Sequence, residues 1–204
     1  LVLAGIIIAL SKRARIVAIG LGLFFFLLFL CFHVYYQLFL NQFGFQLGLW
    51  TNALKELAFS GSAFIVAASY PQEKFLASNK LLFTLGRIFF AIMLIVFGID
   101  HFLYTEFVVP LVPAWIPGAT FWTYFGAVAL IGAGVCFLLK IKLRLIGMLA
   151  GIMIFLWFII LHIPRAIADP YGEKGNEITS VFQALAFSGI CFLIALLPGR
   201  RNNR

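Results

Sequence analysis

The pentapeptide Leu57-Ala58-Phe59-Ser60-Gly61 occurs a second time in this chain of 204 residues, as Leu185-Ala186-Phe187-Ser188-Gly189. The two copies are displaced by 128 residues. Further pairs, at a displacement of 129, are Arg15 and Arg144, Gly22 and Gly151, and His33 and His162. Apolar residues coincide easily in apolar segments, but an arginine, a histidine and glycines in one register carry more weight. We interpret the sequence as a tandem duplication of one unit.

The composition is that of a membrane protein, because 64% of the residues are hydrophobic, 11% are charged and the mean hydropathy is +1.09. A helix needs about 20 apolar residues to cross the hydrocarbon core. Six runs meet that length and a seventh is partial; the predicted spans are Leu1–Leu10 (partial), Ile16–Tyr36, Ala53–Tyr70, Leu81–Tyr104, Ala119–Leu139, Leu145–Ile163 and Ser180–Leu197. The chain is therefore predicted to be a polytopic helical membrane protein.

The predicted fold is all-α, with two four-helix-bundle units in parallel tandem repeat. Because Leu1 aligns with Leu130 in the middle of a span, we expect an incomplete first unit and a parent chain of eight spans. The predicted boundaries are 1–70 for the C-terminal part of the first unit, 71–80 for a cytoplasmic linker, 81–199 for the complete second unit and 200–204 for a basic cytoplasmic tail.

Lysine and arginine gather at one set of span ends, while most acidic residues lie at the other. The clustered cations include Lys12, Arg13, Lys140, Lys142 and Arg144, whereas Lys55, Arg165 and Lys174 lie at the opposite ends. The positive-inside rule places the first set in the cytoplasm. We therefore expect a multi-pass protein of the bacterial inner membrane. The net charge of +8 reflects this topology, so the expected partners are the lipid bilayer and other membrane subunits, and not nucleic acid.

Ionisable residues and one asparagine gather at the predicted external span ends of the second unit. Because charge within a bilayer is costly, they are candidates for function. They are Asp100 and His101 at the end of one span, His162 and Arg165 on one face of another, and Asn176 and Glu177 at the start of the last. The Pro-rich segment Thr105–Gly118, which contains Trp115, cannot form a regular helix and is predicted to lie over them as a lid.

Two interpretations of these residues remain open. In the first, an apolar pocket binds a quinone or a lipid head group through His101, Trp115, His162 and Arg165. In the second, the residues form a structural polar cluster that holds helix ends together; we assign to it Asp100, Glu177, Asn176, Arg87 and His33. No catalytic residue and no set of metal ligands is predicted. Haem held between His33 and His162 is an alternative that we do not favour.

The two units differ in the residues that follow the matched histidine. Tyr35 and Tyr36 follow His33, where the second unit has Pro164 and Arg165. A small-molecule site is therefore predicted in the second unit. Arg87, about two turns inside a span, can extend to the interface, bind a lipid phosphate or bind a neighbouring carbonyl.

Four segments of the second unit carry a family resemblance: LGRIFFAIMLIVFGIDHF (85–102), LVPAWIPGATFWTYFGAVALIGAG (111–134), LHIPR (161–165) and NEITSVFQALAFSG (176–189). In this order they resemble the DoxX family of small four-helix membrane proteins, and the first unit looks like a truncated, degraded copy. The resemblance implies an accessory subunit of a larger bacterial membrane complex, respiratory or photosynthetic, linked to quinone or electron transfer and without a redox centre of its own. The alternatives are a small-molecule transporter or permease and an autonomous membrane oxidoreductase.

Overall fold

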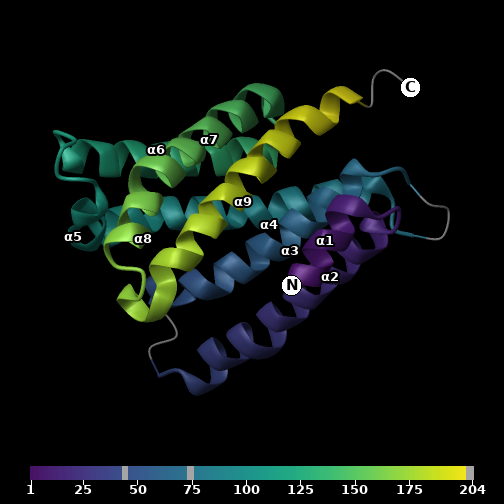
Figure 1. The fold of residues 1–204 in the computed structure, drawn as a ribbon, viewed down its shortest axis with the longest axis horizontal. Helices are drawn as coiled ribbons and strands as arrows, with labels where there is room; N and C mark the ends of the chain where they lie inside the picture. The colour runs from purple at the N-terminus through teal and green to yellow at the C-terminus, as the bar shows by residue number, and fades with distance from the viewer. Residues whose placement is uncertain (43–45, 73–75, 201–204) are drawn as a thin grey trace.

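The computed structural model describes residues 1–42, 46–72 and 76–200, and within them the side chains of 172–174 and 198–200 are not described. Every regular element in these ranges is helical, which confirms the predicted all-α class (Figure 1). In chain order the elements are α1 (Val2–Leu10), α2 (Ala14–Leu28), the π-helices η1 (Phe29–Val34) and η2 (Tyr36–Leu40), the 3-10 helix η3 (Leu47–Trp50), α3 (Thr51–Ser69), α4 (Asn79–Leu103), α5 (Thr105–Val108), the 3-10 helix η4 (Val109–Leu111), α6 (Ala119–Leu139), α7 (Leu143–Trp157), the π-helix η5 (Phe158–His162), α8 (Ile163–Ala168) and α9 (Gly172–Arg200). The predicted basic tail, 200–204, lies outside the described residues except for the backbone of Arg200.

Five helical stretches of the described chain are long and apolar enough to cross a membrane. They are Ala14–Leu40, Asn79–Leu103, Ala119–Leu139, Leu143–Ala168 and Gly175–Leu197. Each overlaps a span predicted from the sequence, and the expected multi-pass membrane protein is consistent with them.

The predicted span Ala53–Tyr70 forms α3 but is not one of these five stretches. The reason is composition, because polar residues such as Asn52, Lys55 and Glu56 make α3 less apolar than the five stretches. The helix packs against α2, α4 and α9, and most of its residues are buried. A helix enclosed by other helices is shielded from lipid, so it can carry polar residues such as Lys55 and Glu56.

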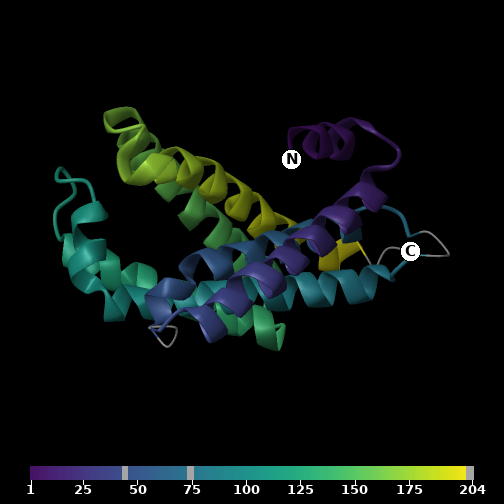
Figure 2. The same cartoon turned by 90° about the horizontal axis from the view of Figure 1, so that it is seen from below.

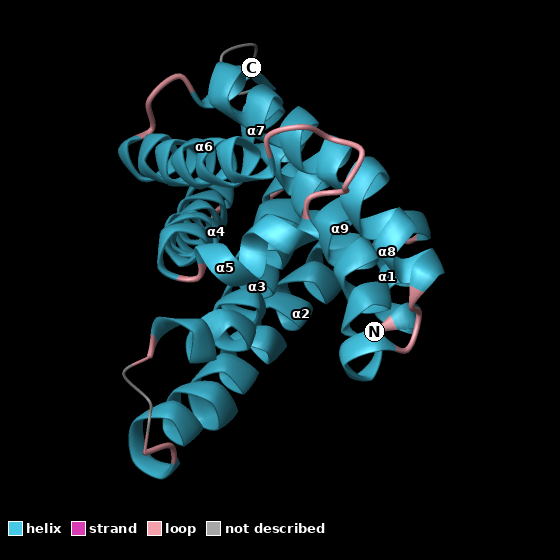
Figure 3. Ribbon diagram, turned by 90° about the vertical axis from the view of Figure 1, so that its left-hand side faces the viewer, coloured by secondary structure: helices cyan, strands magenta, loops and turns pink. Residues whose placement is uncertain are grey.

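Four helices lie next to one another in the order α2, α3, α9, α7, and α4 and α6 pack on one side of this row (Figure 1). The end-on view in Figure 3 has α3 near the middle of the molecule. Figure 2 shows that α1 folds back from the start of α2. The Tyr70 hydroxyl holds α1 in place by donating a hydrogen bond of 2.7 Å to the Ile8 carbonyl.

Glycines permit the close helix crossings. A Cβ atom on Gly61 of α3 would lie 2.6 Å from the carbonyl oxygen of Gly86 on α4. One on Gly134 of α6 would lie 2.8 Å from the Ala91 carbonyl oxygen, again on α4. Small residues are favoured where transmembrane helices approach so closely, because van der Waals packing holds such helices together.

One pair of contacts occurs twice in the structure. On α3, the Ser60 hydroxyl donates a hydrogen bond of 2.8 Å to the carbonyl of Gly22 on α2. On α9, the Ser188 hydroxyl donates one of 2.9 Å to the carbonyl of Gly151 on α7. The Phe64 ring fills the space beside Gly22, and the Phe192 ring fills the space beside Gly151. All of these residues are counterparts in the register of the predicted repeat.

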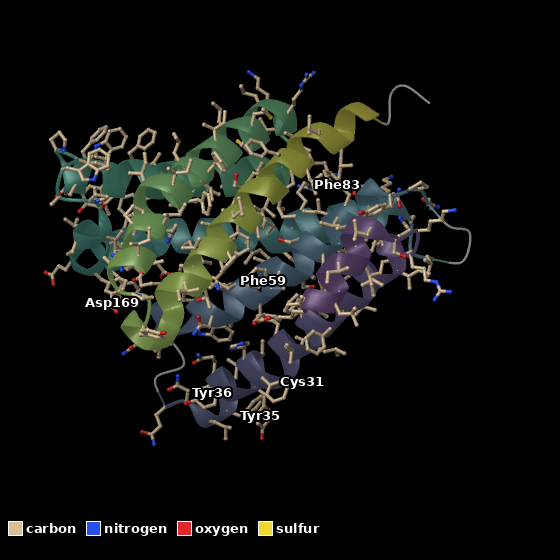
Figure 4. The ribbon with its side chains drawn as sticks, in the orientation of Figure 1. Cys31, Tyr35, Tyr36, Phe59, Phe83 and Asp169 are labelled. Carbon is tan, nitrogen blue, oxygen red and sulfur yellow. The ribbon has the colours of Figure 1, made fainter. Side chains whose placement is uncertain are left out.

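Between α3 and α9, two side chains that correspond in the predicted repeat are in contact. The rings of Phe59 on α3 and Phe187 on α9 have centroids 5.2 Å apart. Figure 4 labels Phe59 on α3, where that helix passes close to α9. The third residues of the two LAFSG segments are therefore in contact with each other.

The glycine crossings predict a contrast within α6. The substitution Gly134→Ala should destabilise the protein by about 1–3 kcal/mol, because the new methyl group overlaps the α4 backbone. Gly132→Ala is the matched control, since nothing lies within 4 Å of its Cβ position, and it should change stability by no more than about 1 kcal/mol. Thermal unfolding of both variants in one detergent measures the difference. Equal losses would contradict the crossing.

Candidate functional site

A bidentate ion pair joins α8 to the start of α9. The Arg165 guanidinium donates from Nε to Glu177 Oε2 at 3.0 Å and from Nη2 to Glu177 Oε1. The Glu177 side chain is only 11% exposed, and that of Arg165 is 31% exposed. The planar fork of arginine matches both carboxylate oxygens, so the pair fixes the orientation of the two helices as well as their charges. The sequence prediction that these two residues converge is confirmed in this contact.

His162, at the end of η5, lies beside this ion pair. Its Nδ1 atom is buried and has no hydrogen-bond partner in the described part of the chain. The charges that act on the ring are those of Glu177, Arg165 and Lys55. Lys55 belongs to α3, so the site spans both halves of the chain. Lys55 was not predicted to belong to the cluster, although its position at the cation-poor span ends was a signal that it could belong there.

His101 belongs to a different environment. Its Nδ1 lies 2.6 Å from the carbonyl oxygen of Phe97, one turn earlier in α4. Its ring is stacked with Trp157 of α7, with centroids 6.5 Å apart. Asn176 and Asp100 are two other predicted site residues. The carbonyl oxygen of Asn176 accepts a hydrogen bond from the Thr179 hydroxyl at 2.9 Å. Asp100 Oδ1 is buried without a hydrogen-bond partner among the described residues. The contacts of His101 therefore tie it to α4 and α7, whereas the charges that act on His162 are those of Glu177, Arg165 and Lys55.

The segment predicted to be a lid does not close a pocket. Thr105–Val108 and Val109–Leu111 form two short helical turns after α4. The Trp115 side chain that follows is 72% exposed. A side chain this exposed covers no enclosed space, so the expectation that Trp115 seals an apolar pocket is corrected. The proline residues break the helix as predicted, but the segment extends to the surface beyond α5 and α6 (Figure 1).

Two arginines near the opposite helix ends are almost fully buried. Arg87 of α4 donates from Nη1 to the Leu138 carbonyl at 3.1 Å. Of the three alternatives for Arg87, the structure therefore shows the bond to a neighbouring carbonyl. Arg15 of α2 was not predicted as a site residue. Its guanidinium binds the carbonyls of Ala67 and Ala77 at 3.0 and 2.6 Å and also the Asn79 side chain, and so joins α2, α3 and the start of α4.

In the first half, the counterpart of the Arg165–Glu177 pair is missing. His33 lies in the π-helix η1, as His162 lies at the end of the π-helix η5. Tyr35 and Tyr36 are each more than half exposed and lie at the outer edge of the molecule in Figure 4. Within the described residues, no three His, Cys, Asp or Glu side chains group together in a way that could hold a metal ion.

The cluster has the chemistry of a small polar binding site. The Glu177 carboxylate is occupied by Arg165, and the buried His162 nitrogen remains to donate or accept a hydrogen bond. An imidazole nitrogen beside an ion pair and apolar helices suits a ligand with a hydroxyl or carbonyl oxygen on an apolar body.

Comparison with known proteins gives one match. The family model for a domain of unknown function, DUF8561, matches residues 90–190, which run from α4 into α9 and contain His162, Arg165 and Glu177. The match covers just under half of the chain and carries no assigned activity. No curated protein and no solved structure matches the chain.

The ion pair predicts a measurable coupling. Replacing Glu177 with Gln leaves the guanidinium of Arg165 without its carboxylate in a partly buried position, so stability should fall by about 1–3 kcal/mol, between the values for surface and buried pairs. Arg165→Gln should cost a similar amount. The double variant should lose less than the sum of the two, as measured by unfolding in detergent. Additive losses would show that the two side chains do not interact.

Proposed function

We propose that this chain is a DoxX-like accessory subunit of a larger complex in the bacterial inner membrane, linked to quinone or electron transfer and without a redox centre of its own. Its cation-rich helix ends face the cytoplasm. It consists of two related helical units, and it binds its partner subunit through a face of α9 that the described residues leave uncovered. The observation that carries the proposal is a difference between α9 and its counterpart α3.

The repeated contacts support the relationship between the units. The Ser60–Gly22 hydrogen bond recurs as Ser188–Gly151, and the same helix pairs, α2 with α3 and α7 with α9, make them. If a twofold axis along the membrane normal relates the two units, a residue that lies on the axis touches its own counterpart in the other unit. The pair of Phe59 and Phe187 has this property, so we place the axis between them.

The face of α3 that surrounds Gly61 is covered by α4. Gly61 and Ile65 contact the α4 backbone at Gly86. Residues three, four and seven positions away lie on the same helix face. Among them, Leu57 is 6% exposed and Leu54 is 7% exposed. This face is therefore a tight helix–helix interface with a glycine at its centre.

The counterpart face of α9 is uncovered. Leu185 is 44% exposed where Leu57 is buried, and Phe182 is 68% exposed where Leu54 is buried. Nothing lies within 4 Å of the Cβ position of Gly189, the counterpart of Gly61. Bulky apolar residues alone would suit contact with lipid, but a glycine at the centre of the face forms a notch that suits the close approach of another helix.

The occupant that we propose is a transmembrane helix that lies on α9 as α4 lies on α3, and we assign it to a partner subunit because no described helix of this chain covers Gly189. The α4 helix cannot fill the notch, because its own glycine face already binds α3. The partner helix would have a small residue opposite Gly189, as α4 has Gly86 opposite Gly61. The Arg165–Glu177 pair at the start of α9 would hold the docking helix at a fixed angle, and the free His162 nitrogen would face a quinone bound within the assembled complex.

The notch predicts the effect of filling it. In the native membrane, Gly189→Ile should abolish most of the larger complex, because the side chain blocks the approach of the partner helix. The isolated chain should keep its thermal stability, since the position is open. Native gel analysis and a photo-crosslinking residue at Leu185 measure the assembly, and the wild-type chain should crosslink to another protein.

Gly132→Ile is the control at an equally open glycine on α6, and it should leave the complex intact. Gly61→Ile should destabilise the isolated chain, because Gly61, the counterpart of Gly189, already lies in a helix–helix interface. Retention of the complex by the Gly189→Ile variant, or crosslinks from position 185 to lipid alone, would refute the docking face.

A further inference from the structure

The turn between α6 and α7 has three cations around a shallow, open depression in the surface. Lys140, Lys142 and Arg144 line it together with the apolar side chains of Leu143, Leu145 and Met148. All three cations are exposed. Because the turn joins two helices long enough to span the membrane, it lies at the level of the lipid head groups. Positive charges therefore border an apolar surface at the depth where a phospholipid changes from head group to acyl chain.

The backbone of this turn presents both lysines. Lys140 has a φ of 59° and Lys142 a φ of 41°, in the left-handed region that glycine usually occupies at the end of a helix. A residue with a Cβ atom costs about 1–2 kcal/mol in this region. In this turn, two lysines occupy left-handed positions in spite of that cost. Behind it, Arg87 donates to the carbonyl of Leu138, two residues before Lys140, and adds a fourth positive charge.

In the counterpart turn of the first half, the arginine that corresponds to Arg144 binds oxygen atoms of the protein. Arg15, the counterpart of Arg144, is buried and donates to the carbonyls of Ala67 and Ala77 and to the Asn79 side chain. Of these partners, Ala77 lies just before α4 and Asn79 is the first residue of α4. The Arg144 side chain is exposed and has no hydrogen bond or ion pair within the described part of the chain. The second half therefore has the same cation without its oxygen ligands.

We propose that the α6–α7 turn binds the phosphate of an anionic phospholipid. Arg144 donates to the phosphate oxygens in place of the carbonyls that Arg15 uses, and Lys140 and Lys142 neutralise the charge from either side. The acyl chains lie along Leu145 and Met148. This site is separate from the α9 docking face, at the opposite ends of the helices from His162, and it does not depend on a partner subunit.

Titration of the purified chain with short-chain phosphatidylglycerol tests the site, with binding followed by thermal stabilisation and by native mass spectrometry. Short-chain phosphatidylcholine tests whether a net negative charge is needed, and inorganic phosphate tests whether the acyl chains are needed. The variant K140Q/K142Q should bind phosphatidylglycerol at least about tenfold more weakly, given the contribution of each lysine near a head group. Arg144→Gln should also weaken binding.

The matched control is K12Q/R13Q, which removes two exposed cations from the counterpart turn at the same membrane face. It should leave the affinity for phosphatidylglycerol within about twofold of the wild type, since Arg15 already has protein ligands. Equal losses from the two double variants would show diffuse attraction to charge and would overturn the proposal. Equal stabilisation by inorganic phosphate, or by phosphatidylcholine, would also overturn it.

Discussion

The close approach of helix backbones at glycine is the constraint on which the rest of this structure depends. Helices in lipid gain little from the hydrophobic effect when they associate, so their packing must come from short-range contact. At the crossing of α3 and α4, Gly61 and Gly86 bring the two backbones together. At the crossing of α7 and α9, a Cβ atom on Gly147 would lie 2.7 Å from the Cys191 carbonyl oxygen. The central position of α3 and the orientation of α9 both follow from these crossings.

The sequence predicted the helices well because each apolar run must form its hydrogen bonds internally once it is in lipid. The span predicted at 53–70 forms α3, but this helix is less apolar than the five stretches that are long and apolar enough to cross a membrane. Hydropathy measures exposure to lipid, and α3 is enclosed by α2, α4 and α9, so its polar residues are tolerated. The π-helices η1 and η5 were not predicted. A π-turn changes the hydrogen-bond spacing of the backbone without a pattern of residues that marks it.

The candidate site was predicted where local spacing determines it and missed where packing does. His162 and Arg165 are three residues apart on one chain segment, so their shared position follows from helical geometry, and Glu177 follows from a short connection. His101 was grouped with them only because it lies at the same depth, and depth does not specify which neighbouring helix a side chain faces. The contribution of Lys55 depends on the contact between α3 and α9, which couples residues more than one hundred positions apart. No local pattern predicts such a contact.

The central claim is that a twofold axis relates the two halves. Distances between spin labels test it most directly, because a twofold axis requires the separation of Ile16 from Ile152 to equal that of Leu23 from Leu145. These positions are counterparts in the repeat, and all four side chains are exposed on α2 and α7. Pulsed electron paramagnetic resonance in nanodiscs should give two distance distributions with the same mean. Two clearly separated means would contradict the axis and with it the relationship between α3 and α9.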